Sequence, residues 1–370
     1  MLSLLYPTRE MIALKAPGSI RRYDESFINM TLAERSRFLD FSYRQVTPQV
    51  EHHQGVTVTR SGVCIRGGRI IPASIHWHRR IHHKLLVTTF ASLARRKRVR
   101  LVEGKPYIII HNMWTGGYYH WIAEALPRLI AAKDHLADGI LLLPQSKSLE
   151  RVMLESAAVF GATAIQRFPG NANVMVPDLV LPRNSPLINN YQPNEMEELR
   201  ERAAWAARDH PAPLGARRLF ISRSRSRGRK IANEEEVQAR LIELGFSVVH
   251  LEDFGFLDQV RLFQQADEVV AQHGAGLVNI AFMRPGTRVI ELIRRQGTRR
   301  SDWNRLHQSS LLQAAYPKLA ACMNVYYECL LCEAVDVGQT FDIGDVFVDV
   351  EQLVAKLGAV RTFGGGRFCG

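Results

Sequence analysis

The stretch from residue 268 to residue 292, EVVAQHGAGLVNIAFMRPGTRVIEL, constrains the fold of this chain more than any other. It begins with a short run rich in β-branched residues, which predicts a buried strand. A small-residue turn, HGAG, then leads into a segment that fits a helix of about two turns. Pro285 and Gly286 end the helix, and a second strand-like run, TRVIEL, follows. Such a βαβ unit forms a parallel sheet that binds ligands at the carboxyl ends of its strands.

The turn in this unit has residue types that suit an anion. Gly274 and Gly276, on either side of Ala275, let a ligand approach the backbone without a Cβ in the way. Unpaired N–H groups and the dipole at the start of the helix favour a phosphate or pyrophosphate, and His273 can donate to an anionic oxygen. The alternative is a tight turn that only packs a strand closely against a helix.

Two further polar residues of the unit are expected near the same edge of the sheet. Asn279 lies in the predicted helix, and Glu291 is expected at the end of the second strand. A carboxylate in that position accepts hydrogen bonds from ribose hydroxyls. The alternative for Glu291 is an ordinary charge at a strand end.

A basic loop earlier in the chain supplies candidate phosphate ligands. It follows a predicted strand, residues 218–222, and precedes a helix that Asn233 can cap. Arg223 comes directly after the strand, and Arg229 and Lys230 follow. Arginine forks suit bidentate phosphate contacts. The alternatives are a solvated loop or a nucleic-acid-binding tract, although no aromatic residues interrupt the basic ones, which argues against nucleic acid.

The third candidate segment is YYHWIAEALPRL, residues 118–129. His120, Glu124 and Arg128 have the spacing i, i+4, i+8, which predicts one polar stripe on an otherwise apolar helix. Buried charges need partners or a ligand, so either Glu124, our first choice, or His120 is expected to act as a general base. The alternative is a structural His–Glu–Arg network.

Length and composition limit the classes of protein that this chain can belong to. Its 370 residues suggest two domains, and 46% hydrophobic with 23% charged residues is ordinary for a globular protein. No apolar run reaches the ~20 residues that span a bilayer, and the N-terminus does not read as a signal peptide, so we expect a cytoplasmic location. Five cysteines, an odd number, argue against a disulfide framework and favour buried free thiols. The net charge of +12 attracts phosphorylated substrates, nucleic acid or anionic lipid, and it predicts weak attachment to an anionic membrane. The basic run at residues 94–100 is either a solvated face or a contact with anionic lipid head groups.

Strands and helices alternate in both halves of the chain, which predicts an α/β fold with two Rossmann-like domains. A proline-rich linker at residues 210–215 separates the halves. We expect an N-terminal acceptor-side domain over residues 1–210 and a nucleotide-binding domain over residues 211–312. Residues 313–370 are expected to form an extension whose last helix packs back on the N-terminal domain.

Taken together, three blocks resemble glycosyltransferase family 61: YYHWIAEALPRL, ISR followed by RKIANEEEV, and HGAGLVNIAFMRPGTRVIEL. The resemblance implies a GT-B fold of two domains facing a cleft, and an inverting transferase that uses a nucleotide-sugar without a required metal or other cofactor. It also implies a glycan or lipid-linked glycan as acceptor, typical of capsule or lipopolysaccharide assembly in bacterial members. By this resemblance the HGAG block faces the donor and the His120–Glu124 helix faces the cleft. We expect Tyr119, Arg128 and Asn112 on the acceptor side of that cleft. A nucleic-acid-binding protein and a non-catalytic sugar-nucleotide or glycan-binding module are the alternatives.

Overall fold

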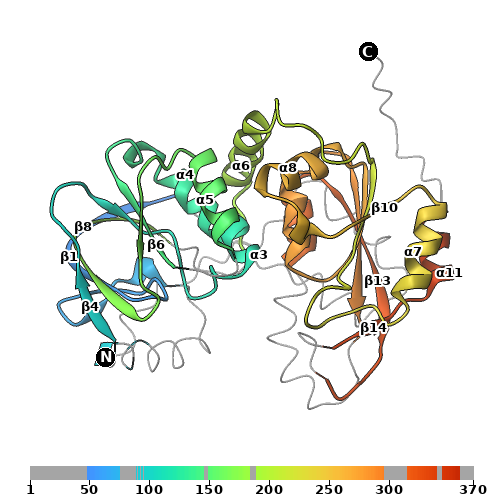
Figure 1. Cartoon of the computed structure of the whole chain (residues 1–370), viewed down its shortest axis with the longest axis horizontal. Helices are drawn as coiled ribbons and strands as arrows, with labels where there is room; N and C mark the ends of the chain where they lie inside the picture. The colour runs from blue at the N-terminus through green and yellow to red at the C-terminus, as the bar shows by residue number, and fades with distance from the viewer. Residues whose placement is uncertain are drawn as a thin grey trace, which may run out of the picture.

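The computed structural model of the chain describes residues 48–75, 89, 91, 93–94, 96–145, 149–183, 189–295, 315–339 and 344–358. Figure 1 shows an N-terminal half and a C-terminal half, each built on a β-sheet, with helices between the two sheets. The N-terminal segment, the histidines at residues 76–83, Cys369 and the glycine-rich end at residues 363–370 lie outside the described residues.

The first sheet is mixed. Its strands run in the order β3-β2-β1-β8-β5-β6-β7, with β4 beside β8. The strands β4 to β8 pair in parallel, whereas β1 pairs antiparallel with both β8 and β2. The Rossmann-like prediction therefore holds for only part of this half, because the antiparallel hairpin at residues 50–70 had no clear sequence pattern. The strands are β1 (Val50–Val58), β2 (Cys64–Arg66), β3 (Arg69–Ile70), β4 (Lys97–Arg100), β5 (Tyr107–Ile108), β6 (Ile140–Pro144), β7 (Ile165–Phe168) and β8 (Ala172–Pro182).

The helices of the first half pack their apolar stripes toward the interior. In α6, Met196, Leu199 and Ala203 recur at helical spacing and are buried, while the charged residues are exposed or only partly buried. The helical elements are η4 (Pro72–Ser74), α3 (Tyr118–His120), η5 (Trp121–Ala125), α4 (Leu126–Ala131), η6 (Lys133–His135), α5 (Glu150–Val159) and α6 (Pro193–Ala206).

The second sheet has the order β10-β9-β11-β12-β13-β14 and is parallel except for β14. All five residues of β11 are buried, as expected for a strand covered on both faces. The chain leaves β9 toward β10 on one side and returns past it to β11 on the other, so the direction of winding switches between β9 and β11. Open α/β sheets bind ligands at such a point. The strands are β9 (Arg218–Ile221), β10 (Ser247–Val249), β11 (Glu268–Gln272), β12 (Arg288–Arg294), β13 (Tyr326–Ala334) and β14 (Val346–Phe347).

Helices α7 and α11 lie on the outer face of this sheet, and α8 lies on the side toward the first half (Figure 1). The last helix, α11, packs against α7 and the second sheet, so the prediction that it packs back on the N-terminal domain is wrong. Strand β13 also pairs with β12, and the described residues beyond 312 thus continue the second half. The helical elements are α7 (Glu234–Glu243), η7 (Leu251–Asp253), α8 (Phe256–Gln265), η8 (Ala275–Phe282), α10 (Ala315–Cys322) and α11 (Val350–Gly358).

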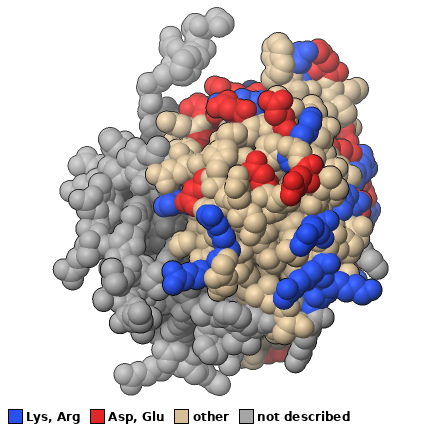
Figure 2. All heavy atoms as spheres, turned by 90° about the vertical axis from the view of Figure 1, so that its left-hand side faces the viewer, with Lys and Arg blue, Asp and Glu red and all other residues tan. Residues whose placement is uncertain are grey.

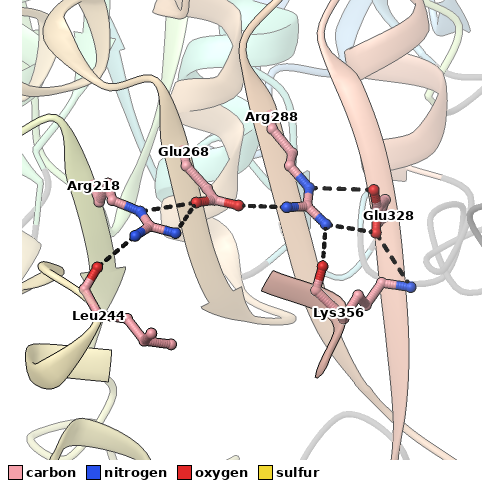
Figure 3. Close-up of polar contacts among 6 residues, drawn as sticks. All are labelled: Arg218, Leu244, Glu268, Arg288, Glu328 and Lys356. Carbon is pink, nitrogen blue, oxygen red and sulfur yellow. Dashed lines mark hydrogen bonds and ion pairs between the residues drawn. The ribbon is translucent and has the colours of Figure 1, made fainter. Parts of the chain in front are cut away.

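A ladder of charges ties together the amino ends of the parallel strands, opposite the edge where ligands bind (Figure 3). Glu268 lies between Arg218 and Arg288, with N–O distances of 2.6 and 2.7 Å. Glu328 accepts from Arg288 at 3.0 Å and lies 3.3 Å from the buried Lys356. Each buried charge therefore has an opposite charge beside it, and the pairs join β9, β11, β12, β13 and α11.

One hydrophobic cluster runs through both halves. It contains Ile108 and Trp121 from the first half together with Phe256, Val269 and Phe282 from the second. The α/β class is thereby confirmed, with a continuous core beneath both sheets. The GT-B arrangement of two domains facing a cleft stays a prediction.

The face that Figure 2 shows belongs to the side of the first sheet, and its basic side chains gather on the lower part of the view. Strand β4, within the predicted basic run, carries exposed side chains at Lys97, Arg98 and Arg100. Contact of this half with an anionic membrane stays a prediction.

Candidate functional site

The turn His273–Gly276 and the basic loop meet beyond the carboxyl ends of β9 and β11. Gly274 has an extended backbone with φ of 175°, so its conformation does not require glycine. Its lack of a side chain does matter, because a Cβ there would lie 3.0 Å from Cζ of Arg223 and closer still to Nη1. The guanidinium thus lies across the bare backbone of the turn, and the predicted pairing of Arg223 with the glycine turn is observed.

A cavity of about 100 Å³ opens at this point. It lies at the switch between β9 and β11, where an open α/β sheet binds its ligand. Its polar wall includes Arg223 and the backbone of Gly274 and Gly276. The lining residues are Ile221, Ser222, Arg223, Ser226, Leu251, Glu252, Ala271, Gln272, Gly274, Gly276 and Leu277.

Backbone carbonyls hold Arg223 in place. Its Nε donates to the carbonyl of Arg229 at 3.1 Å, and its Nη2 donates to that of Gly228 at 3.2 Å. Burial, and then the nearby charge of Arg229, lower the pKa of Arg223. Among the described residues of this loop, only Arg225 forms a salt bridge, with Asp253 at 2.7 Å. Two arginines close together without a carboxylate at salt-bridge distance make a site that favours an anion.

The neighbouring predicted residue, Lys230, is exposed, and its backbone N–H donates to Asp345 at 2.7 Å. This bond, with the bridge between Ile231 and Val346, fixes the end of the loop against β14. Lys230 is not among the residues that line the cavity.

The imidazole of His273 is held by a buried carboxylate. Its Nδ1 lies 2.5 Å from Oε1 of Glu291, and the hydroxyl of Tyr327 donates to Oε2 at 2.5 Å. The expected position of Glu291 at a strand end is wrong, because β12 continues to Arg294. Its side chain is fully buried, and the two contacts turn it toward His273 and Tyr327. Glu291 therefore orients His273.

Asn279 also lies deeper than predicted. The expected α-helix is a 3-10 helix, η8, which is buried between the two halves. There Asn279 accepts from the hydroxyl of Tyr118 at 2.7 Å and donates to Gln259 at 2.9 Å, with no exposed surface. Its amide links η8 to the first half. The structure thus places Asn279 in the interior, whereas we expected it beside the nucleotide-sugar donor.

His120 and Glu124 form a pair, as their spacing predicted. Nδ1 of His120 lies 3.0 Å from Oε1 of Glu124, and the imidazole stacks on Trp114. Asn112, in the loop after β5, donates to the other carboxylate oxygen at 2.9 Å and accepts from Thr115. The side chain of His120 is 22% exposed and that of Glu124 is 10% exposed, so the imidazole is the more accessible member.

Arg128 does not join this pair. The segment Trp121–Ala125 forms a π-helical turn, just before Pro127, which has no N–H to donate. Arg128 points into the interior, where its guanidinium donates to the carbonyls of Ile110 at 2.5 Å and Pro182 at 2.8 Å. Burial lowers its pKa to about 10. The prediction that Arg128 lines the acceptor cleft is therefore wrong. The spacing i, i+4, i+8 places these side chains on one face only in a regular α-helix, and Arg128 instead binds the backbone at the end of β5.

A tyrosine that the sequence did not indicate joins the two groups of residues. Tyr316, at the start of α10, donates to the carbonyl of Gly274 at 2.5 Å. Its ring packs edge-on against His273 at 5.3 Å and against Tyr119 at 5.9 Å between centroids. Tyr119 in turn donates to Asn189 at 2.7 Å. No motif marked Tyr316, because its place depends on how α10 packs beneath η8.

The described cysteines are free thiols, as predicted, and three of the four are buried. Within the described ranges, no group of three or more His, Cys, Asp or Glu side chains is placed to hold a metal ion. In the same ranges, no helix combines the length and the apolar character needed to cross a bilayer.

Comparisons with known proteins relate this geometry to one enzyme family. The model of the family glycosyltransferase 61 matches residues 118–290, which include the His120–Glu124 pair, Arg223 and the turn His273–Gly276. Protein O-linked-mannose beta-1,4-N-acetylglucosaminyltransferase 2 of Bos taurus is 29% identical over 215 residues, 55% of this chain and 32% of that protein. The Mus musculus protein of that name is 39% identical over 84 residues, 22% of this chain and 14% of its own length. Beta-1,2-xylosyltransferase XAX1 of Oryza sativa subsp. japonica is 34% identical over 111 residues, 28% and 19% of the two chains.

The aligned regions thus span about a third or less of these curated relatives. The resemblance of the three sequence blocks to glycosyltransferase family 61 is confirmed. The relatives are glycosyltransferases, named for transfer of N-acetylglucosamine or xylose.

Proposed function

Since residues 118–290 of this chain belong to glycosyltransferase family 61, we propose that it transfers a sugar from a nucleotide-sugar donor to a hydroxyl of a glycan or lipid-linked glycan. One observation carries this proposal: Arg223 and the turn at Gly274 meet at a cavity on the switch point of a parallel sheet. Such sheets bind phosphorylated ligands there. The names of the relatives, an N-acetylglucosaminyltransferase and a xylosyltransferase, support transfer of a sugar.

In this proposal the donor diphosphate lies between Arg223, Arg229 and the backbone N–H groups of the turn. The bond from the anomeric carbon to the diphosphate breaks, and the leaving oxygen gains negative charge. These two arginines, which have no carboxylate at salt-bridge distance among the residues that the structure describes, stabilise that charge, and His273, oriented by Glu291, adds a hydrogen-bond donor. The leaving group then needs no metal ion, and transfer in the presence of EDTA tests that part of the proposal.

The acceptor hydroxyl is deprotonated by the His120–Glu124 pair. The more exposed imidazole faces the acceptor and takes its proton, while Glu124, held by Asn112, orients the ring and stabilises the imidazolium. This order differs from our first choice from the sequence, because both oxygens of Glu124 already contact neighbours. The oxygen attacks the anomeric carbon opposite the leaving diphosphate, which inverts its configuration.

A single substitution tests the acceptor half. Glu124→Gln keeps the shape of the side chain but removes its charge, so transfer should fall at least about a hundredfold while nucleotide binding is kept. Glu243→Gln, on the exposed surface of α7, is the matched control. Turnover near that of the wild type in Glu124→Gln would remove this pair from the mechanism.

A thermal-shift screen with UDP-, GDP-, CMP- and dTDP-sugars tests the donor half. A ligand at a hundred times its Kd stabilises the folded state by about 2.7 kcal/mol, which is readily measured. Absence of any shift would contradict a nucleotide-sugar transferase. A shift without turnover on any acceptor would instead indicate a sugar-nucleotide-binding module.

A further inference from the structure

One end of the first sheet carries a group of basic side chains that the proposed transfer reaction does not use. β1 and β4 pair with opposite edges of β8 at the same residue, because Val58 and Val99 are both partners of Val174. Each step between neighbouring strands is about 4.8 Å, so the end of β1 and the strand β4 lie roughly 10 Å apart. We call the basic residues of β4 and of the turn after β1 the basic edge: Arg60, Arg96, Lys97, Arg98 and Arg100.

The basic edge has no carboxylate to neutralise it among the residues that the structure describes. None of its members forms a salt bridge with a described Asp or Glu, and all but Arg96 are exposed. Two of the guanidinium groups lie around one peptide of the loop between β7 and β8. Nη1 of Arg96 donates to the carbonyl of Gly170, and a Cβ added to Gly170 would lie 3.6 Å from Cζ of Arg60. Positive charges gathered in this way attract anions, and salt screens the attraction.

The charges of the first half are separated on its surface. Strand β4 lies at the lower left of Figure 1, and Figure 2 shows the face that is seen from that side. Basic side chains gather mainly on the lower part of this face and acidic ones mainly on the upper part. The part of the face toward β4 is therefore the positive one.

The composition of the basic edge favours lipid over nucleic acid as its partner. Residues 58–62, 96–105 and 169–175 contain one acid, Glu103, and no aromatic residue. Proteins that bind single-stranded nucleic acid stack its bases on aromatic side chains. The basic edge instead has an aliphatic neighbour, Val102, which is 79% exposed. Basic side chains attract anionic head groups, and an exposed aliphatic side chain can enter the interface of a bilayer.

The basic edge also lies beside the loop that holds the His120–Glu124 pair. Gly62, in the turn after β1, has a φ of +74°, which favours glycine. A Cβ there would lie 3.1 Å from Cα of Asn112 and closer still to the carbonyl of His111, so the turn packs directly on this loop. Asn112 in turn donates to Glu124 at 2.9 Å. A short run of contacts thus connects the basic edge to the side chains expected to activate the acceptor.

We propose that the basic edge docks the protein on the surface of a membrane that contains anionic lipid. Docking brings the His120–Glu124 pair close to the plane in which a lipid-linked glycan presents its hydroxyls. The docking itself is independent of the proposed transfer reaction, and only its use for a lipid-linked acceptor rests on that function.

Flotation of the full chain with lipid vesicles tests the docking. The wild type should float with vesicles of phosphatidylcholine and phosphatidylglycerol, should not float with phosphatidylcholine alone, and should be released by high salt. Arg98→Gln combined with Arg100→Gln should lower the partition coefficient about 30-fold, because each basic side chain near an anionic surface is worth about fivefold. Both side chains are exposed, so the Tm should not change.

A matched control removes the same charge from the second half. Arg217→Gln combined with Arg240→Gln changes exposed side chains far along the chain from the basic edge, and it should leave the partition coefficient nearly unchanged. Equal losses in the two double variants would overturn the proposal, because net charge alone would then explain the binding. Wild-type protein that does not float with anionic vesicles would overturn it too, and would leave the transferase proposal standing.

Binding to RNA gives the competing outcome. Polyuridylic acid that binds the wild type, but not Arg98→Gln combined with Arg100→Gln, would assign the basic edge to nucleic acid if the wild type does not float with anionic vesicles. That result would overturn membrane docking. Flotation of a protein that shows no thermal shift with any nucleotide-sugar would support docking and refute the donor half of the proposed function, so the two proposals can fail separately.

Discussion

Replacing Gly274 with alanine separates the role of Arg223 in binding from its role in stability. The added Cβ would meet the guanidinium of Arg223, the far end of a flexible side chain. The backbone of Gly274 is extended, so alanine fits its φ without strain. Arg223 must therefore leave its place over the turn while the fold stays intact.

The magnitude follows from what Arg223 loses. Its two hydrogen bonds to carbonyls contribute about 1 kcal/mol each to stability. The Gly→Ala change offsets about half of their sum, because alanine lowers the conformational entropy of the unfolded chain. The free energy of unfolding should thus fall by about 1 kcal/mol or less. A hydrogen bond from Arg223 to a charged donor phosphate is worth about 1.5–3 kcal/mol, so the Kd for a nucleoside diphosphate should rise about 10- to 150-fold.

A double-mutant cycle gives the decisive reading. The Kd of a nucleoside diphosphate is measured for Gly274→Ala, for Arg223→Ala and for the double variant, with urea unfolding of each. If Gly274→Ala acts only by displacing Arg223, it should not raise the Kd further when Arg223 is already replaced by alanine. Gly215→Ala, where a Cβ meets no atom within 4 Å, is the control. Wild-type affinity in Gly274→Ala, or losses that add fully in the double variant, would refute the reasoning.

Three further predictions concern stability. Glu328→Gln leaves the buried charges of Arg288 and Lys356 without their shared carboxylate, so the free energy of unfolding in urea should fall by about 3–5 kcal/mol. Asp253→Asn, at an exposed ion pair, should lower it by less than about 1 kcal/mol. Similar losses in the two variants would contradict a stabilising role of the charge ladder. Tyr118→Phe removes a donor to the buried Asn279 and should cost about 1–3 kcal/mol, and an unchanged urea midpoint would show that this bond does not stabilise the fold. Burial raises the pKa of Glu195 from 4.5 to about 7, so the unfolded chain loses this proton first and the stability of the wild type falls between those pH values by about 3 kcal/mol. Glu195→Gln should remove this pH-dependent loss of stability. Identical profiles of stability against pH for the two proteins would show that Glu195 does not cause the loss.

Local patterns predicted the second half of the fold well. Its strands are short apolar runs between glycine, proline and capping signals, and these features are read within a window of a few residues. The pairing of His120 with Glu124 and the meeting of Arg223 with the glycine turn were predictable for the same reason. One depends on helical spacing, and the other on two strand ends that share a sheet edge.

The remaining parts of the site depend on packing between segments far apart in the chain. The π-helical turn before Pro127 accompanies the inward position of Arg128. Pro127 predicts an irregularity in this helix, but it does not predict which way Arg128 turns. The sequence around Asn279 and Glu291 is compatible with ligand contacts. Their actual partners, Tyr118 and Tyr327, lie in other elements and cannot be inferred from the local sequence.

The core that runs beneath both sheets limits how this molecule can move. Separating the halves as two rigid bodies would expose apolar surface of the shared core, such as that between Phe160 and Phe256, at about 25 cal/mol for every Å² brought into water. It would also break the bond between Tyr118 and Asn279. Substrate entry is therefore expected to use small sliding motions of α3 against η8, and a wide hinge opening would be rare at equilibrium.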